Sequence, residues 1–307
     1  MRNPKIGIEI ITLQHIFIKI LNKKKYIISF ALLGFLQSIF SQEWSSTVIP
    51  VKINEEFVWV LDKEHSDEFN YSGKTKKFQE KWIDNHRRNW SGPGLTQFDN
   101  EYSFIKNNQL IVSSGITRKI PNKRIYCGYV TSKKPIMYPV FTEVKMKVSG
   151  SWLSSNFWLL STDDVNEIDV TETYGMDDVK GKTMNTNYHI FRRHPFKDLT
   201  PQNGKNHNSK EDVALKNDWH RFGVYWKSAT EFIFYFNGKP VRSLNKSTDL
   251  KDPRGRYFDQ PMHLIMNLED HPWRVDMGKT PTKSELRNYK LNKMYVDWIR
   301  TYKLVHK

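Results

Sequence analysis

Three carboxylates stand within six positions in "NEIDVTETYG", residues 166–175, as Glu167, Asp169 and Glu172. Because side chains alternate between the two faces of a strand, Glu167 and Asp169 share a face, and one β-bulge before Glu172 returns that residue to the same face. Two glutamates leaning towards each other then reach roughly the 5–5.5 Å carboxyl separation of a retaining glycosidase. The spacing therefore predicts hydrolysis of a glycosidic bond through a covalent intermediate.

Each acid of this stretch has its own expected task. One carboxylate must stay ionised to attack the anomeric carbon, while another must hold a proton for the leaving oxygen. Asp169, between them, can hydrogen-bond the nucleophile and couple the two titrations. An exposed acidic strand and a calcium site are the alternatives. Calcium loops are usually turn-forming and rich in Gly and Asn, and this segment is neither.

The elements that must position these acids are short strand-like runs separated by turn signals. "FTEVKMKV" (141–148) alternates, and "EFIFYFNGKPVRSL" (231–244) predicts a hairpin turning at Asn237-Gly238. Further strands are expected at 220–226 and 294–303, and one short helix at 282–289. The pattern predicts an all-β fold, a β-sandwich jelly roll of two curved antiparallel sheets with a substrate cleft on the concave face.

The first forty-one residues differ from the rest of the chain. Lys23, Lys24 and Lys25 precede an apolar run from Tyr26 to about Phe40, and small and polar residues follow. This order is typical of a secretory signal peptide cleaved near Ser41, with residues 1–21 as a long leader or an extension ahead of the true start. A membrane anchor is the alternative, but the run is shorter than the ~20 residues of a spanning helix. The catalytic domain is expected over 42–307.

The charge of the chain points to an anionic partner. The formal charge is +15, and the six basic residues and one acid before residue 42 account for +5, which leaves +10 after cleavage. An exported basic protein meets polyanions, although solubility alone also explains the charge. No zinc-finger, helix-turn-helix or RNA-binding signature appears, so a polysaccharide fits better than nucleic acid. The single cysteine, Cys127, excludes an intrachain disulfide.

The acid motif and its flanks resemble glycoside hydrolase family 16, the jelly-roll endo-glycanases that act with retention. Within that family the sequence is most similar to the red-algal galactanases, namely β-porphyranases and then β-agarases. The resemblance covers essentially all of 57–303. The matching stretches are "SDEFNY", "KWIDNHRRNWSGPGLTQFDNEYSF", "YPVFTEVKMKVSGSWLSSNFWLL", "NEIDVTETYG", "NYHIFRRHPF", "DWHRFGVYW", "NLEDHPWR" and "MYVDWIRTYK".

The resemblance implies site residues one by one. Glu167 matches the nucleophile, Glu172 the acid/base and Asp169 the assisting aspartate. Trp158 matches a tryptophan that supports the sugar beside the scissile bond. The remaining expected substrate contacts are Trp90, Trp273, His189, Glu269 and His271, with core filling as the alternative for the tryptophans.

The choice of polymer depends on sulfate. Agarose is neutral, whereas porphyran carries a 6-sulfate that arginine would bind. The segments "HRRNW", "FRRHP" and "HPWR" therefore favour porphyran, with Arg88, Arg193 and Arg274 as expected contacts. Arg87 and Arg192 are expected to point outward. Agarose, furcellaran and carrageenan remain alternative substrates, and a non-catalytic carbohydrate-binding protein is the alternative class.

The remaining expectations concern partners and ions. No cofactor is required, and a structural calcium or sodium is expected, if anywhere, near Asp297 and the Ser66–Asn70 segment. We expect a secreted or periplasmic monomer that binds neither nucleic acid nor, after signal cleavage, membrane.

Overall fold

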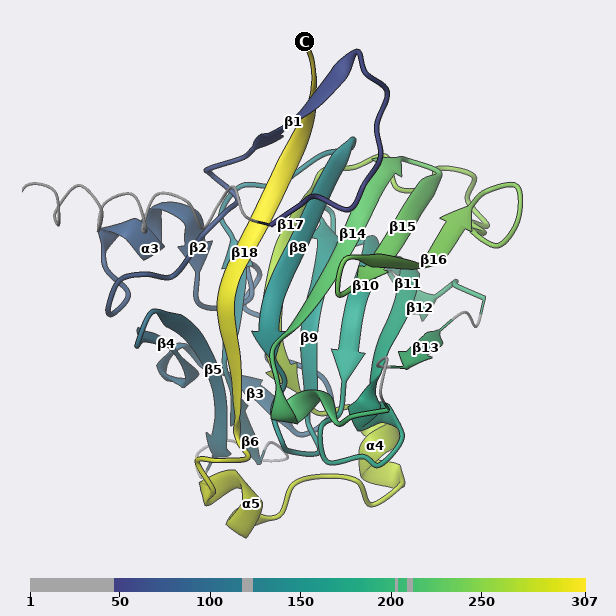
Figure 1. Cartoon of the computed structure of the whole chain (residues 1–307). Helices are drawn as coiled ribbons and strands as arrows, with labels where there is room; N and C mark the ends of the chain where they lie inside the picture. The colour runs from purple at the N-terminus through teal and green to yellow at the C-terminus, as the bar shows by residue number, and fades with distance from the viewer. Residues whose placement is uncertain (1–46, 118–123, 202–203, 209–211) are drawn as a thin grey trace, which may run out of the picture. The chain divides into compact units, whose positions relative to one another are not determined.

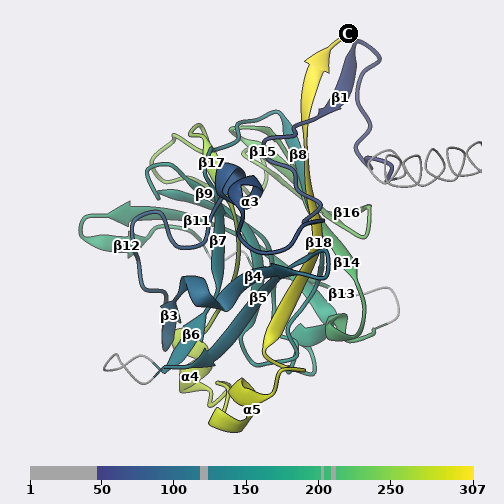
Figure 2. The same cartoon turned by 90° about the vertical axis from the view of Figure 1, so that its left-hand side faces the viewer.

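Two twisted sheets lie face to face in the computed structural model, which describes residues 47–117, 124–201, 204–208 and 212–307 (Figure 1, Figure 2). Residues 50–307 form one compact unit. The expected signal peptide, 1–41, lies outside the described residues. Within the described part of the chain, no helix has the length and apolar character needed to cross a membrane.

The larger sheet has ten strands, nearly all antiparallel, and its long members form one layer in Figure 1. Its order is β16 (Lys239–Asn245), β15 (Glu231–Phe236), β14 (His220–Ser228), β8 (Val140–Lys147), β18 (Lys293–His306), β5 (Gln109–Ile116), β6 (Ile125–Cys127) and β3 (Thr96–Phe98). β1 (Phe57–Leu61) pairs with β18, and β4 (Ser103–Lys106) pairs with β5. Only β3 and β6 run parallel among the described pairings.

The smaller sheet has eight strands and carries the acid motif. Its order is β12 (Phe196–Asp198), β11 (Thr183–Arg193), β10 (Asn166–Thr173), β9 (Ser154–Ser161), β17 (Met262–Glu269), β7 (Tyr129–Ser132) and β2 (Trp82–Ile83), with β13 (Lys205–Asn208) on β11. The described helices are short: α3 (Lys76–Lys81), α4 (Pro272–Asp276), α5 (Lys283–Arg287) and the 3-10 turns η1 (Asn100–Tyr102), η2 (Lys180–Lys182) and η3 (Leu215–Asn217).

The core is built from alternate residues of both sheets. Ile168 and Val170 of β10 are fully buried in one apolar cluster with Val144 of β8 and Val224 of β14. Burying one face of β10 in this way leaves its acids on the opposite face. The all-β jelly-roll prediction is confirmed.

Local signals also match the structure. Asn237 and Gly238 have φ angles of 48° and 75°, as the predicted tight turn requires. The predicted helix at 282–289 is α5, where Thr282 and Glu285 form a reciprocal capping box. The sequence analysis predicts no helix at Pro272–Asp276, where the structure has α4.

Candidate active site

A β-bulge in β10 brings the three acids Glu167, Asp169 and Glu172, here called the acid triplet, onto one face. The ladder between β10 and β9 shifts between Asp169 and Thr171, so Val170 is the extra residue. The β9 partners of the triplet are, in order, Leu160, Trp158 and Asn156. Those partners alternate along β9 and share a face. The bulge predicted from the spacing is therefore confirmed.

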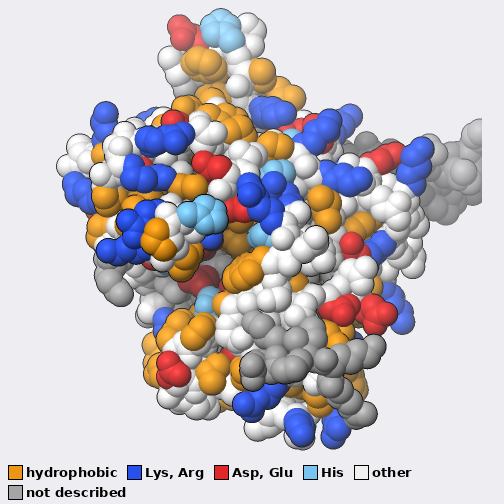
Figure 3. Space-filling view, turned by 180° about the vertical axis from the view of Figure 1, so that it is seen from behind, with side chains coloured by type: hydrophobic (Ala, Val, Ile, Leu, Met, Phe, Trp, Pro, Cys, Tyr) orange, Lys and Arg blue, Asp and Glu red, His pale blue; other side chains and the backbone are white. Residues whose placement is uncertain are grey.

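Two adjoining cavities lie over this face of the smaller sheet. The larger, about 910 Å³, contains the whole triplet, and the smaller is about 660 Å³. Glu172, His189 and His271 line both, which makes the two cavities one continuous cleft. Figure 3 shows this face hollowed, with acidic and histidine side chains inside the hollow.

Crowding changes the proton affinity of the acids. Burial, reinforced by Glu269 and Glu172, raises the pKa of Glu167. Burial and the neighbouring Glu167 and Glu172 likewise raise the pKa of Asp169, whose Oδ2 is buried and has no hydrogen-bond partner among the described residues. These carboxyls therefore keep protons to a higher pH than separated carboxyls would.

His189 links the triplet to a carboxylate outside the motif. Its Nδ1 lies 2.6 Å from Oδ2 of Asp198, and its Nε2 lies 3.5 Å from Oδ2 of Asp169. Burial opposes a charge on the ring, but the hydrogen bond to Asp198 and the nearby Asp169 outweigh it and raise the pKa of His189 to about 9. The imidazolium thus offsets part of the negative charge around Asp169.

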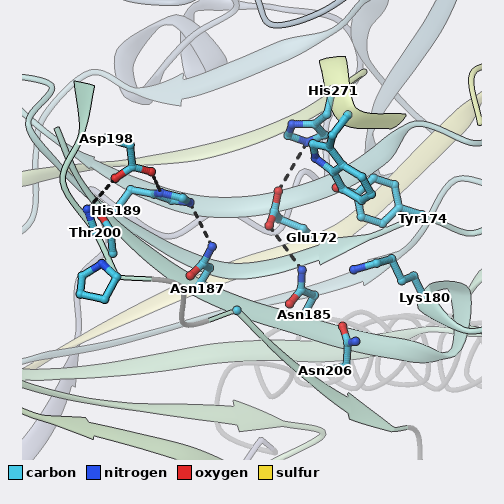
Figure 4. Close-up of a pocket in the computed structure, with 13 residues that line it drawn as sticks. Glu172, Tyr174, Lys180, Asn185, Asn187, His189, Asp198, Thr200, Asn206 and His271 are labelled. Atoms are coloured by element: carbon cyan, nitrogen blue, oxygen red, sulfur yellow. Dashed lines mark hydrogen bonds and ion pairs between the residues drawn. The ribbon is translucent and has the colours of Figure 1, made fainter. Parts of the chain in front are cut away.

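Glu172 lies between a histidine and an amide in Figure 4. Nε2 of His271 is 3.4 Å from Oε1 of Glu172 and 3.4 Å from Oε1 of Glu269, while Asn185 donates to Glu172 at 3.5 Å. Glu269 is held by Asn156 and Asn267, each at 2.9 Å. The expectation that Glu269 and His271 reach the cleft therefore matches their positions.

The three expected tryptophans all line the cleft, in different ways. Trp158 is 94% buried and donates from Nε1 to Asn267 at 2.7 Å, so it is part of the core and of the cleft floor. Trp90 and Trp273 are 44% and 41% exposed and lie in the larger and the smaller cavity. Exposed flat rings in a cleft suit stacking on sugar faces.

The arginines expected to contact substrate differ in their positions and partners. Arg88 and Arg193 line the larger cavity, but both bond to the turn residue Asp164. Arg87 also pairs with Asp164, at 3.1 Å, and Arg192 is exposed and bonds the Pro195 carbonyl.

The expectation for Arg274 is wrong. Its side chain is only 1% exposed and pairs with Asp177 at 3.0 Å. Because residues 272–276 form a helix, the side chain is carried beneath the cleft, where it packs under Tyr174 and Trp273. A buried, paired guanidinium of this kind stabilises the loop and does not face a substrate.

The ion positions expected from the sequence have protein partners. Asp297 pairs with Lys145 at 2.7 Å, and Asp67 accepts hydrogen bonds from Phe69, Tyr71 and Trp82. Within the described ranges, the acid and histidine groups close enough to share an ion lie in the cleft itself. A structural calcium or sodium stays a prediction.

Several cleft residues were missed from the sequence. They are Asn156, Asn185, Asn187, Lys180 and Asp198, together with the buried Asn267 that supports Trp158 and Glu269. Asn156 could have been found, because it alternates with Trp158 along one strand. No local sequence pattern identifies Asp198 as a site residue, since only the pairing of β11 with β12 brings it to His189.

Comparisons with known proteins agree with this geometry. The family model described as "Beta-porphyranase A-D, GH16 domain" matches residues 59–304. The chain is 49% identical to an extracellular agarase of Streptomyces coelicolor, over 86% of this chain and 89% of that one. A beta-porphyranase B of Phocaeicola plebeius is 27% identical, over 82% and 86%.

A solved structure gives the same picture. Beta-agarase A of Zobellia galactanivorans superposes with a TM-score of 0.80 at 29% identity, covering 87% of this chain and 100% of that one. With the acid triplet on one face of the smaller sheet and the family model spanning most of the sequence, the chain belongs to glycoside hydrolase family 16, in the branch that contains β-agarases and β-porphyranases.

Proposed function

We propose that the chain is a secreted, endo-acting, retaining hydrolase of the β-1,4 linkages of agarose, the neutral red-algal galactan. The observation that carries the choice of polymer is the charge of the cleft. The larger cavity is lined by six carboxylic residues, Asp163, Asp164, Glu167, Asp169, Glu172 and Glu269, of which Asp169 is proposed to be protonated, against two arginines and the His189 imidazolium. Both arginines already bond to Asp164, Arg88 to its carboxylate and Arg193 to its main-chain carbonyl, so a sulfate placed there would have to compete for their donors.

The proposed mechanism assigns the triplet as follows. Glu167 attacks the anomeric carbon, and Glu172 protonates the leaving oxygen and then activates the water that hydrolyses the glycosyl-enzyme. Asp169 carries a proton, consistent with its raised pKa, and donates it in a hydrogen bond that favours the anionic form of Glu167. His271, between Glu172 and Glu269, orients the acid/base carboxyl.

The polysaccharide is proposed to bind along the continuous cleft. Trp158 forms the floor beside the triplet, and the exposed rings of Trp90 and Trp273 stack sugars in the larger and the smaller cavity. The two adjoining cavities share Glu172, His189 and His271, and a cleft that extends to both sides of the acid/base suits attack within a chain. Export is supported by the basic and apolar order of residues 22–42 and by the extracellular relative.

The test is incubation of the chain without residues 1–41 with agarose, porphyran, carrageenans and furcellaran, followed by sizing of the products. We expect rapid loss of agarose chain length and a β-anomer as the first product in proton NMR. An initial α-anomer would refute retention, and intact agarose would refute the proposed substrate.

Porphyran is the second candidate. The description of the matching family model favours it, and so does Lys180, whose ammonium lies over the ring of Trp273 at 5.5 Å in the smaller cavity. A higher kcat/KM on porphyran than on agarose in the same experiment would make it the substrate.

A further inference from the structure

We propose that Asp164 sets the choice between neutral and sulfated galactan by occupying the hydrogen-bond donors of the arginines at one end of the cleft. This inference rests on the proposed function, because it concerns how that cleft selects between polymer substrates. It assigns a specificity-determining task to a residue outside the acid triplet.

Three arginines from two distant segments converge on Asp164. Nε of Arg88 lies 2.7 Å from Oδ2, and Nη2 of Arg87 lies 3.1 Å from Oδ1. Nε of Arg193 donates to the main-chain carbonyl of the same residue. Both oxygens of the carboxylate are thereby occupied by guanidinium groups.

The two arginines that reach the cleft are held by second contacts as well. Nη2 of Arg88 donates to the Thr162 carbonyl at 3.0 Å, and the guanidinium of Arg193 lies 4.5 Å above the ring of Phe191. A sulfate could bind these groups only beside the Asp164 carboxylate, whose charge repels it. The aromatic and apolar lining around them, including Trp90 and Phe196, suits an uncharged sugar.

The turn that carries Asp164 is rigid. The Ser161 hydroxyl accepts from the main-chain N–H groups of Val165 and Asn166, and the Asp164 N–H bonds the Ser161 carbonyl. Asp164 has φ = 61°, in the left-handed region where Asn and Asp are favoured over other side-chain-bearing residues. The carboxylate is therefore fixed in place, and Asn is the replacement that the backbone accepts.

The experiment compares Asp164→Asn with Asp163→Asn. Both substitutions remove one negative charge from the cleft lining. Asp164 pairs with arginines, whereas Asp163 forms no ion pair with an arginine among the described residues. We expect Asp164→Asn to raise the ratio of kcat/KM on porphyran to kcat/KM on agarose by roughly tenfold or more, the size of one charge-assisted hydrogen bond. Asp163→Asn should change that ratio by less than about threefold. Adding Arg88→Gln to Asp164→Asn should remove the gain.

The outcomes separate this inference from the proposed function. A native chain that leaves agarose intact refutes the proposed function. A native chain that hydrolyses agarose, with an Asp164→Asn ratio unchanged or matched by Asp163→Asn, refutes only the role of Asp164. If Asp164→Asn fails to fold, Arg88→Gln alone decides. In Arg88→Gln, the ratio of kcat/KM on porphyran to kcat/KM on agarose should stay within about twofold of native. A loss of kcat/KM on porphyran alone would overturn the inference.

Discussion

Nδ1 of His189 lies 2.6 Å from Oδ2 of Asp198, a contact between the strand beside the acid triplet and the short strand at the edge of the sheet. The same ring faces Asp169 on its other side at 3.5 Å. One imidazolium is thus shared by a cleft carboxyl and an edge carboxylate. Its protonation state should influence both folding and the charge of the catalytic face.

Stability should fall at alkaline pH because of this histidine. The pKa of His189 is about 9 in the folded chain against 6.5 for an unperturbed histidine. Since the folded pKa is the higher, the stabilisation is fully present below about pH 6.5 and is lost as pH rises through about 9. We expect the midpoint of thermal unfolding to decrease between pH 7 and pH 10.

Asp198→Asn is the control for that prediction. It removes the closest anion, so the pKa of His189 should drop and the decrease between pH 7 and pH 10 should become smaller. Asp212→Asn, which removes an exposed partner of Lys182, should leave the decrease as in the native chain. Equal decreases in the native chain and in Asp198→Asn would contradict the role of the pair.

Glu167→Gln and Glu172→Gln should each remove nearly all turnover. Loss of a positioned acid/base costs roughly 10²- to 10⁴-fold in kcat, and loss of the nucleophile at least as much. Because Gln preserves size, thermal unfolding should stay close to native. Near-normal turnover in both variants would refute the catalytic assignment.

Azide should distinguish the two proposed roles. Azide supplied to Glu167→Ala can attack the anomeric carbon directly, which yields an α-glycosyl azide. In Glu172→Ala, azide replaces water in the attack on the glycosyl-enzyme, because azide needs no general base. This reaction yields a β-glycosyl azide. NMR of the products checks the assignment, and the reverse pattern would exchange the two roles.

The exposed tryptophans should affect binding without affecting stability. Trp90→Ala and Trp273→Ala remove half-exposed rings, so we expect KM for agarose to rise roughly two- to tenfold, the size of one stacking contact. Trp158→Phe instead breaks the buried bond to Asn267 and should destabilise the fold by about 1 kcal/mol. Unchanged KM in both Ala variants would contradict the stacking role.

Arg274 and Lys279 give a matched pair for the buried anion Asp177, because each lies 3.0 Å from the same oxygen. Arg274 is buried, so Arg274→Ala leaves a poorly compensated buried charge and should cost about 3 kcal/mol of unfolding free energy. Lys279 is about a third exposed, and Lys279→Ala should cost no more than about 1 kcal/mol. Denaturant unfolding measures both, and equal costs would contradict the argument.

Local sequence patterns determined much of the scaffold. Alternation placed Ile168 on the core face and Glu167 on the other, and the spacing to Glu172 required a bulge, which lies at Val170. The Asn237-Gly238 turn and the Thr282 cap are local as well, since each depends on dihedral angles or hydrogen bonds within a few residues. Such features are readable because they need no distant partner.

Tertiary structure decided which polar groups meet. Asp198 reaches His189, and Asn267 reaches Trp158, only through strand pairings between segments far apart in the chain. Arg274 is an expected substrate contact from its sequence, but helix α4 directs its side chain into the interior, against Asp177. The same holds for Arg88, whose guanidinium pairs with Asp164, 76 positions away. Net charge and residue type are properties of the sequence, whereas the partner that neutralises a side chain is set by packing.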